Sequence, residues 1–298
     1  MNGQLEIVAC GFCHNNDAAL LFTKNGLNIV QCKSCGLVYT NPRIIQSNVS
    51  TLYDVSYYNS SNSLSCGYDG YLDERQAIER TFVKRIEFIM RHAPNLKTGF
   101  PRSLLDVGCA LGFLLKILAE RGWDAEGIEL SDYACSFAQK ELGLSVKKGT
   151  LSDIHFAAQR FDLITSWDVI EHSYEPMQDL QIMHSLLKKG GFLSLITPNR
   201  DSLHAKIVGK KWVEYEKPQE HLYFFGLKSI SRILENIGFR IIKTTTVGKY
   251  ITVAFMLNRL NSYSGIFALI GRAIGNKSRG QHIYIDPRDK MHILARKI

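Results

Sequence analysis

Residues 103–112 have the sequence SLLDVGCALG, and this stretch decides the fold class. Residues 103–107, in which Leu104, Leu105 and Val107 are apolar, predict a strand. Gly108 and Gly112 predict a turn at which a ligand can approach the backbone closely. Apolar residues then recur at helical spacing at positions 113, 114, 117 and 118. Strand, glycine-rich turn and helix in this order are typical of a βαβ unit.

The same alternation continues toward the C-terminus. Further strands are predicted over residues 124–129, 145–148, 161–167, 192–197, 239–247 and 291–297. Helices with one apolar face are predicted after Pro176 and over residues 227–237, and Gly190, Gly191 and Gly238 are expected to end them. Strands that alternate with helices indicate an α/β domain around a mainly parallel sheet.

Two acidic residues at strand ends bear on the cofactor. Glu129 ends the second strand, where its carboxylate can accept both hydroxyls of a ribose, so a nucleoside-bearing cofactor is predicted. Asp106 favours S-adenosylmethionine over a dinucleotide, because a carboxylate there would repel a pyrophosphate but attract an ammonium or a sulfonium. The alternative is that the acids are only a strand cap and that the glycine of the turn only packs a helix.

Four of the seven cysteines form two CxxC pairs, Cys10 with Cys13 and Cys32 with Cys35, separated by residues 14–31. This is the spacing of a zinc ribbon. Each pair is expected on a tight turn whose backbone N–H groups point at the sulfurs. Four thiolates leave no open position on the ion, so a structural zinc is predicted rather than a catalytic one. Unligated cysteines and a redox pair are the alternatives.

Three regions are predicted along the chain. Residues 1–45 form the zinc ribbon, and residues 46–99 form a linker with a packing helix over 71–93. Residues 100–298 form the main domain, with a mobile, partly helical cover inserted near 250–280. This cover is too polar to span a membrane and at most contacts a membrane surface. The N-terminus lacks a secretory pattern, which predicts a cytoplasmic protein.

The formal net charge of +8 would suit a phosphate-bearing partner. The basic residues are nevertheless scattered in short clusters with acidic residues between them. A dedicated nucleic-acid surface is therefore not expected.

Four segments resemble the class I S-adenosylmethionine-dependent methyltransferases. They are LLDVGCALG at 104–112, GIE at 127–129, FDLI at 161–164 with DVIEH at 168–172, and KGG at 189–191. Their order and spacing match that family over residues 100–245. The resemblance implies a Rossmann-like α/β fold, in which a seven-stranded methyltransferase sheet carries helices on both faces and its last strand is antiparallel.

The resemblance also implies the cofactor contacts. Asp106, Gly108 and Gly112 would hold the amino-acid moiety of S-adenosylmethionine, with Ala110 in place of the usual middle glycine, and Glu129 would hold the ribose.

Three further positions match residues near the cofactor in that family. Thr150 and Leu151 match positions that flank the adenine, where the family often has an acid that this chain lacks. Asp168 matches the position at the junction of cofactor and acceptor.

A narrower resemblance concerns the acceptor. The cysteine pairs, the Tyr57–Tyr58 region and residues 212–225 resemble zinc-ribbon methyltransferases of surface-polysaccharide and secondary-metabolite biosynthesis. This implies a sugar, nucleotide-sugar or glycan acceptor. Related C-methyltransferases of deoxysugars have an extra C-terminal domain for which this chain is too short, so O-methylation is expected. Aromatic residues in 53–71 and 212–225 would stack on sugar rings or pack in the core.

Two histidines are candidate general bases. His172 follows the strand 161–167 and is expected at the carboxyl edge of the sheet, and His221 comes from the loop after the strand 192–197. His172 would otherwise anchor its own loop to a backbone carbonyl. The sequence leaves open an RNA methyltransferase that uses the ribbon to bind RNA, a non-catalytic cofactor-binding scaffold, and the oligomeric state.

Overall fold

The computed structural model describes residues 4–46, 71–97, 102–253, 255–256 and 281–298. Its centre is a sheet of seven strands in the order β12-β15-β10-β9-β6-β7-β8. The strands are β6 (Arg102–Val107), β7 (Trp123–Glu129), β8 (Ser145–Lys148), β9 (Phe161–Trp167), β10 (Leu187–Pro198), β12 (Phe239–Thr246) and β15 (Lys290–Lys297). Strands β6 to β10 are parallel, and β15 runs antiparallel to β10 and β12. The predicted sheet and its antiparallel last strand are confirmed.

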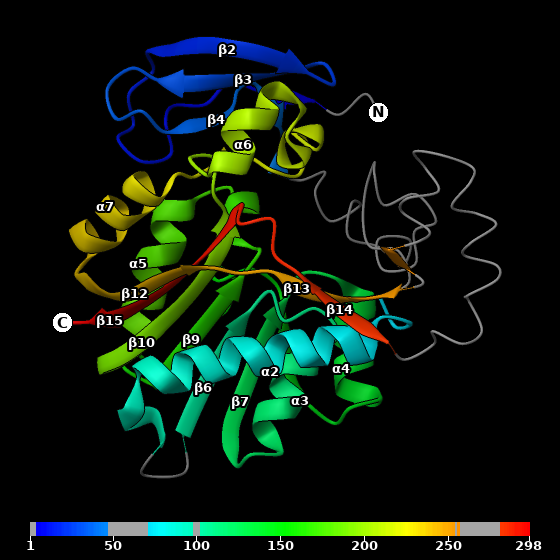
Figure 1. The fold of residues 1–298 in the computed structure, drawn as a ribbon. Coiled ribbons are helices and arrows are strands. Elements are labelled where there is room, and N and C mark those ends of the chain that lie inside the picture. The colour runs from blue at the N-terminus through cyan, green and yellow to red at the C-terminus, as the bar shows by residue number, and fades with distance from the viewer. Residues whose placement is uncertain (1–3, 47–70, 98–101, 254, 257–280) are drawn as a thin grey trace.

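Helices cover both faces of this sheet (Figure 1). One layer holds α2 (Arg75–His92), α3 (Phe113–Ala119) and α4 (Asp132–Lys140), and the other holds α5 (Pro176–Leu186) and α7 (Leu227–Ile237). Successive strand residues point to opposite faces. Leu104 accordingly packs in the α2–α3–α4 core and Leu105 in the α5–α7 core. This burial on both sides explains the continuous apolar runs that predicted the strands.

The start of β10 differs from the prediction. The helix after Pro176 ends at Leu186, and the strand begins at Leu187 rather than Phe192. The glycine pair that was expected to end the helix lies inside the strand. Gly190 has a φ of 78°, and the register on β9 shifts between Leu187 and Phe192. The glycine therefore forms an irregularity in the strand.

The N-terminal region forms a small sheet that includes a strand from the main domain. Its strands are β2 (Ala18–Lys24), β3 (Leu27–Cys32), β4 (Val38–Thr40) and β11 (Tyr223–Phe224), in the order β11-β4-β3-β2. The short strands β1 (Leu5–Glu6) and β5 (Arg43–Ile44) pair beside it. Figure 1 shows this sheet lying against the segment around α6 (Leu203–Val208). The boundary predicted at residue 45 therefore does not separate two independent sheets.

Short 3-10 turns connect the larger elements. They are η3 (Pro94–Lys97), η4 (Ile170–His172), η5 (Gly209–Lys211) and η6 (Val213–Glu216). The turn η4 directly follows β9, and η6 lies in the long connection between β10 and α7. Both turns carry residues of the site described below.

The flanks of the predicted cover at 250–280 are extended. Strands β13 (Lys249–Thr252) and β14 (His282–Ile285) pair antiparallel, and β13 packs against α2. Tyr250 belongs to this strand pair, and residues 253, 255 and 256 are helical. Residues 254 and 257–280 lie outside the described residues, as does the Tyr57–Tyr58 region. Among the described helices, none combines the length and apolarity needed to cross a membrane.

Candidate active site

A cavity of about 1050 Å³ lies at the carboxyl ends of β6, β7 and β9. In an open α/β sheet, ligands bind at this edge, at the point where the strand order reverses. Both candidate histidines, His172 and His221, line the cavity. So do seven of the eight predicted cofactor residues, namely Asp106, Gly108, Ala110, Glu129, Thr150, Leu151 and Asp168.

The turn after β6 depends on left-handed backbone conformations. Gly108 has a φ of 73°, and a Cβ atom there would lie 2.4 Å from Val169 Cγ2. Ala110 replaces the usual glycine and still adopts a φ of 48°. Its backbone N–H donates to Glu129 Oε2 at 2.9 Å. This hydrogen bond offsets the strain of a left-handed alanine, so the loss of the middle glycine is tolerated.

Gly112 is the one predicted cofactor residue that does not line the cavity. It lies at the start of α3 with a φ of 83°, where a Cβ atom would lie 2.7 Å from Leu144 Cδ1 and 3.1 Å from Ala138 Cβ. The absence of a side chain lets α3 pack closely against α4. This packing fits the alternative of a helix-packing glycine, and the cofactor role of Gly112 stays a prediction.

The carboxylate of Glu129 is fixed by the backbone. It accepts hydrogen bonds from the N–H groups of Ala110 and Ser131, each at 2.9 Å, and is 7% exposed. Burial nevertheless raises the pKa of Glu129. Two backbone donors keep the carboxylate at the cavity wall, where further lone pairs remain for a ligand hydroxyl.

Asp106 lies beside it under similar conditions. Its Oδ1 accepts a hydrogen bond from Thr165 Oγ1 at 2.6 Å. Burial, together with the nearby Glu129 carboxylate, raises the pKa of Asp106 to about 7. Two buried acids in such a place favour a ligand that brings positive charge, because a cation stabilises both carboxylates.

An acid does stand near the predicted adenine end, although not at positions 150 and 151. Asp153 lines the cavity, and its Oδ2 accepts hydrogen bonds from Thr150 N at 2.8 Å and Thr150 Oγ1 at 2.7 Å. These bonds lower the pKa of Asp153. The signal in the sequence was the Thr-x-x-Asp turn directly after β8, which the prediction did not use.

Asp168 at the end of β9 is engaged by two cations. Lys290 Nζ lies 2.7 Å from Asp168 Oδ1, and an Arg85 nitrogen lies 3.9 Å from Oδ2. Burial opposes ionisation, but Lys290 and Arg85 lower the pKa of Asp168 below its usual value. The backbone φ of Asp168 is 59°. Asp168 lines the cavity with its charge already paired, and its place at the junction of cofactor and acceptor stays a prediction.

Several further carboxylates in the cavity were not predicted, among them Glu171 and Glu214. Glu171 is 1% exposed and accepts a hydrogen bond from Thr197 Oγ1 at 3.0 Å. Burial and the Asp168 charge raise the pKa of Glu171 to about 8. Burial also raises the pKa of Glu214. Glu171 stood within a recognised segment, whereas no sequence motif marked Glu214 or Lys290.

The structure brings the two histidines together. The ring centroids of His172 and His221 lie 4.7 Å apart with the rings nearly perpendicular. His172 Nδ1 lies 2.9 Å from the carbonyl oxygen of Glu220, so this nitrogen donates and anchors the loop. His221 Nδ1 lies 3.3 Å from Glu214 Oε2, in an alignment that falls short of a hydrogen bond.

Both imidazoles are neutral near pH 7. Burial lowers the pKa of His172 to about 4 and holds the pKa of His221 well below its usual value. The lone pair of a neutral imidazole can accept a proton. An adjacent carboxylate such as Glu214 would stabilise the resulting imidazolium.

The aromatic residues of 212–225 pack in the core and do not line the cavity. The side chains concerned are those of Trp212, Tyr223, Phe224 and Phe225. Trp212 Nε1 donates to Asp289 Oδ2 at 2.9 Å. The expected stacking of these residues on a sugar is therefore wrong, and core packing describes them. The aromatic side chains at the cavity are instead Tyr71, Phe82, Trp167, Tyr174, Tyr250 and Phe255.

The four ribbon cysteines converge on one point. The sulfurs of Cys10, Cys13, Cys32 and Cys35 all lie within 4.8 Å of one another, and the two closest pairs are 3.4 Å apart. Backbone N–H groups at positions 12 and 13 face the Cys10 sulfur. Burial opposes the thiolate of Cys32, but the N–H of Cys35 and the Cys13 thiol lower its pKa to about 7. Four sulfurs at this spacing fit a tetrahedral zinc, in which Zn–S distances are about 2.3 Å.

Residues 75–244 match a protein-family model described as a methyltransferase domain. A ubiquinone biosynthesis O-methyltransferase of Cereibacter sphaeroides is 32% identical over 117 residues, which are 37% of this chain and 47% of that protein. A protein of the same name from Coxiella burnetii is 28% identical over 156 residues, 49% of this chain and 67% of that protein. The chain thus spans about half of the first relative.

Solved structures share the fold at low identity. The magnesium protoporphyrin IX methyltransferase of Synechocystis PCC 6803, solved with bound SAH, superposes with a TM-score of 0.55 at 16% identity. The superposition covers 85% of this chain and 100% of that one.

Proposed function

The chain belongs to the methyltransferase-domain family that residues 75–244 match, and from that premise we propose that it O-methylates a small-molecule acceptor. It is an S-adenosylmethionine-dependent methyltransferase. The observation that carries O-methylation is the pair of neutral, partly buried histidines with Glu214 and Glu171 in the same cavity as the cofactor residues. A hydroxyl needs a nearby proton acceptor to become a good nucleophile.

The cofactor end of the cavity is formed by the β6 turn and the end of β7. Glu129 would accept the ribose hydroxyls of the cofactor, and Asp106 would lie near its positive amino-acid end. Ala110 and Gly108 allow close approach to the backbone. When bound, S-adenosylmethionine supplies a methyl group activated by its sulfonium.

His221 is the proposed general base. It takes the acceptor proton as the new C–O bond forms, and Glu214, 3.3 Å from its Nδ1, stabilises the imidazolium. His172 holds the loop in place through its bond to the Glu220 carbonyl. Lys290 keeps Asp168 ionised beside the reacting atoms. The residues thus divide into a base, its partner and a positioning group.

The acceptor is proposed to carry its hydroxyl on a ring. Tyr71, Phe82 and Trp167 on the cavity wall offer flat apolar faces for such a ring. The names of the relatives support O-methylation in ubiquinone biosynthesis. A sugar, nucleotide-sugar or glycan acceptor, inferred from the zinc-ribbon resemblance, stays a prediction without support from these relatives.

A labelled-methyl assay tests the proposal. Purified protein is incubated with methyl-labelled S-adenosylmethionine and separate pools of phenolic quinone precursors, nucleotide-sugars, glycans and RNA. Label is expected on the oxygen of a hydroxyl attached to the ring of a phenol or sugar, located by mass spectrometry. Label on RNA or on a carbon or nitrogen atom would contradict the proposal.

A further inference from the structure

The N-terminal cysteine unit contacts both walls of the acceptor end of the cavity. On one side, β4 pairs with β11 through Tyr39 with Tyr223 and Val38 with Phe224. Thr40 N donates to Leu222 O at 2.9 Å, and Thr40 Oγ1 donates to the carbonyl of His221 at 3.1 Å. The backbone of His221, the proposed base, is therefore hydrogen-bonded to the end of β4.

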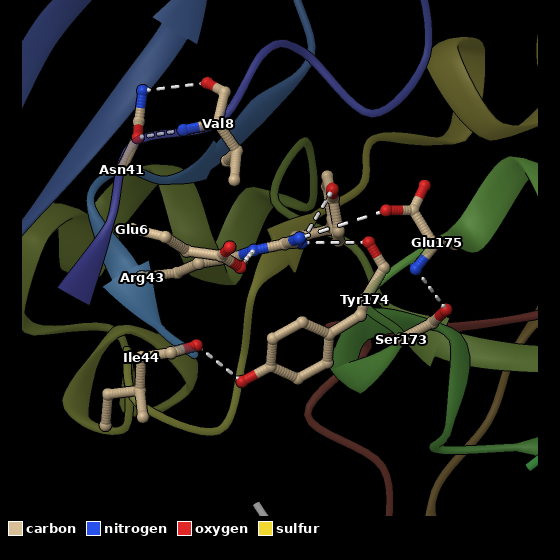
Figure 2. A network of polar contacts seen from close by, with 9 residues as sticks. Glu6, Val8, Asn41, Arg43, Ile44, Ser173, Tyr174 and Glu175 are labelled. Atoms are coloured by element: carbon tan, nitrogen blue, oxygen red, sulfur yellow. Dashed lines mark hydrogen bonds and ion pairs between the residues drawn. The ribbon is translucent and has the colours of Figure 1, made fainter. Parts of the chain in front are cut away.

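Arg43 makes the contact to the other wall, as Figure 2 shows. Its guanidinium is 6% exposed and donates to Glu6 Oε1 and to the carbonyl of Tyr174, each at 2.8 Å. It also lies over the Tyr174 ring, 4.5 Å from the centroid. The Tyr174 hydroxyl donates to Ile44 O at 2.7 Å. Tyr174 lines the cavity two residues after His172.

A third contact holds η6. Lys24 Nζ lies 2.6 Å from Glu216 Oε1, and Asn25 Nδ2 donates to Glu216 O at 2.6 Å. Lys24 and Asn25 lie at the β2–β3 turn, and Glu216 lines the cavity close to Glu214. The ribbon thus fixes the segment that carries the partner of the proposed base.

The two walls are joined to each other at the histidines. His172 Nδ1 donates to Glu220 O, and Leu222 N donates to Glu171 O at 2.8 Å. The cysteine cluster is connected to β4, which pairs with β11. Cys32 ends β3, and Cys35 precedes β4. Cys10 and Cys32 are buried in the same core cluster as Leu222, Tyr223 and Tyr174. Binding of a metal by all four sulfurs would fix β4 and, through it, β11.

We infer that the metal-bound cysteine unit positions the acceptor half of the active site, with Arg43 as its positioning residue. The inference rests on the proposed function for its catalytic consequence only. The cofactor half, built by the β6 turn and Glu129, makes none of these contacts in the described residues. Loss of Arg43 should therefore loosen the acceptor walls and leave cofactor binding intact.

Hydrogen–deuterium exchange of the full zinc-loaded chain tests this without a known acceptor. In Arg43→Ala, amides of residues 170–175 and 218–224 are expected to exchange about tenfold faster or more, while those of 103–112 stay unchanged. The affinity for S-adenosylmethionine should stay within about twofold. Zinc removal with a chelator should accelerate amide exchange in the same two segments. On the acceptor found by the labelled-methyl assay, kcat should fall while KM for S-adenosylmethionine is unchanged.

Arg160→Ala is the matched control, because Arg160 pairs with Glu126 at the other end of the sheet. Thr40→Val, which removes only the bond to the His221 carbonyl, serves if Arg43→Ala fails to fold. Unchanged exchange in 170–175 and 218–224, or equal acceleration over the whole sheet in both arginine variants, would overturn the inference. If the wild type fails to bind S-adenosylmethionine, the proposed function fails, but the exchange comparison remains valid.

Discussion

The Glu129 side chain has two roles. It orders the β6 turn by accepting the Ala110 N–H, and it presents its carboxylate to the cavity. Glu129→Ala should therefore weaken S-adenosylmethionine binding by about 1.5 to 3 kcal/mol, roughly 10- to 150-fold. Equilibrium dialysis with labelled cofactor measures the change. Asp124→Asn, at an exposed position of the same strand, is the control. Equal affinities of Glu129→Ala and the control would refute the ribose assignment.

His221 and Glu214 are expected to affect the reaction rather than cofactor binding. His221→Gln should lower kcat about 10²- to 10⁴-fold, the typical loss for a general base, and Glu214→Gln should lower it less. His172→Gln should act mainly through its loop. Steady-state kinetics on the acceptor found by the labelled-methyl assay provide the measurement. Near-normal turnover in His221→Gln would show that the proton leaves by another route.

Glu171 should make stability depend on pH. Its pKa is about 8 in the folded protein against an ordinary value of 4.5, so the folded state binds more protons between these values. The stabilisation by the protonated group is complete below about pH 4.5 and is lost as the pH rises through about 8. In denaturant unfolding from pH 5 to 8.5, the free energy of unfolding should fall less with pH in Glu171→Gln than in wild type. Glu235→Gln, at an exposed position on α7, should show the pH dependence of wild type. If the free energy of unfolding of Glu171→Gln falls with pH as much as that of wild type, the assignment is contradicted.

The sequence could predict only part of this site. Asp106, Glu129 and Asp168 lie at or directly after the carboxyl ends of strands, and these ends meet at one edge of a parallel sheet, so their positions followed from the strand pattern. Glu214 and Lys290 lie in a 3-10 turn and at the start of the last strand. They reach the cavity only through long-range packing, which no local period reports. Packing glycines and ligand-binding glycines share one motif, so the sequence alone does not separate these two roles for Gly112.

At the scale of elements, the strands and helices of the main domain were predictable because each buries a regular apolar face. Strand β11 was not, since a strand of two residues has no period to detect. It pairs with β4 of the N-terminal sheet, which is distant from it in sequence. The β13–β14 pair was missed for a related reason, because its two strands are separated by residues 253–281.

The cysteine unit should hold one zinc ion per chain. Cys32→Ser removes one of four ligands and should lower the zinc content and the melting temperature, because binding energy of a structural zinc contributes directly to folding. Metal analysis of freshly purified, reduced protein measures the content. Cys109→Ala, which alters a cysteine outside the cluster, should retain the metal. Absence of zinc from the wild type would contradict the zinc assignment.

At the scale of the whole molecule, one cavity is built from two structural units. The Rossmann-like sheet supplies the residues assigned to the cofactor. The ribbon and the long connection after β10 together hold the residues assigned to the acceptor. The α/β fold class followed from alternating strands and helices, whereas the union of the N-terminal sheet and the main domain depends on contacts between residues that are distant in sequence. This division explains why the cofactor is better defined than the acceptor.

The central claim is that this cavity binds S-adenosylmethionine for methyl transfer. Isothermal titration calorimetry of the folded, zinc-loaded chain with S-adenosylmethionine tests it most directly. The account predicts saturable binding of one cofactor molecule per chain, with competition by S-adenosylhomocysteine. No binding of either compound to the folded protein would contradict it.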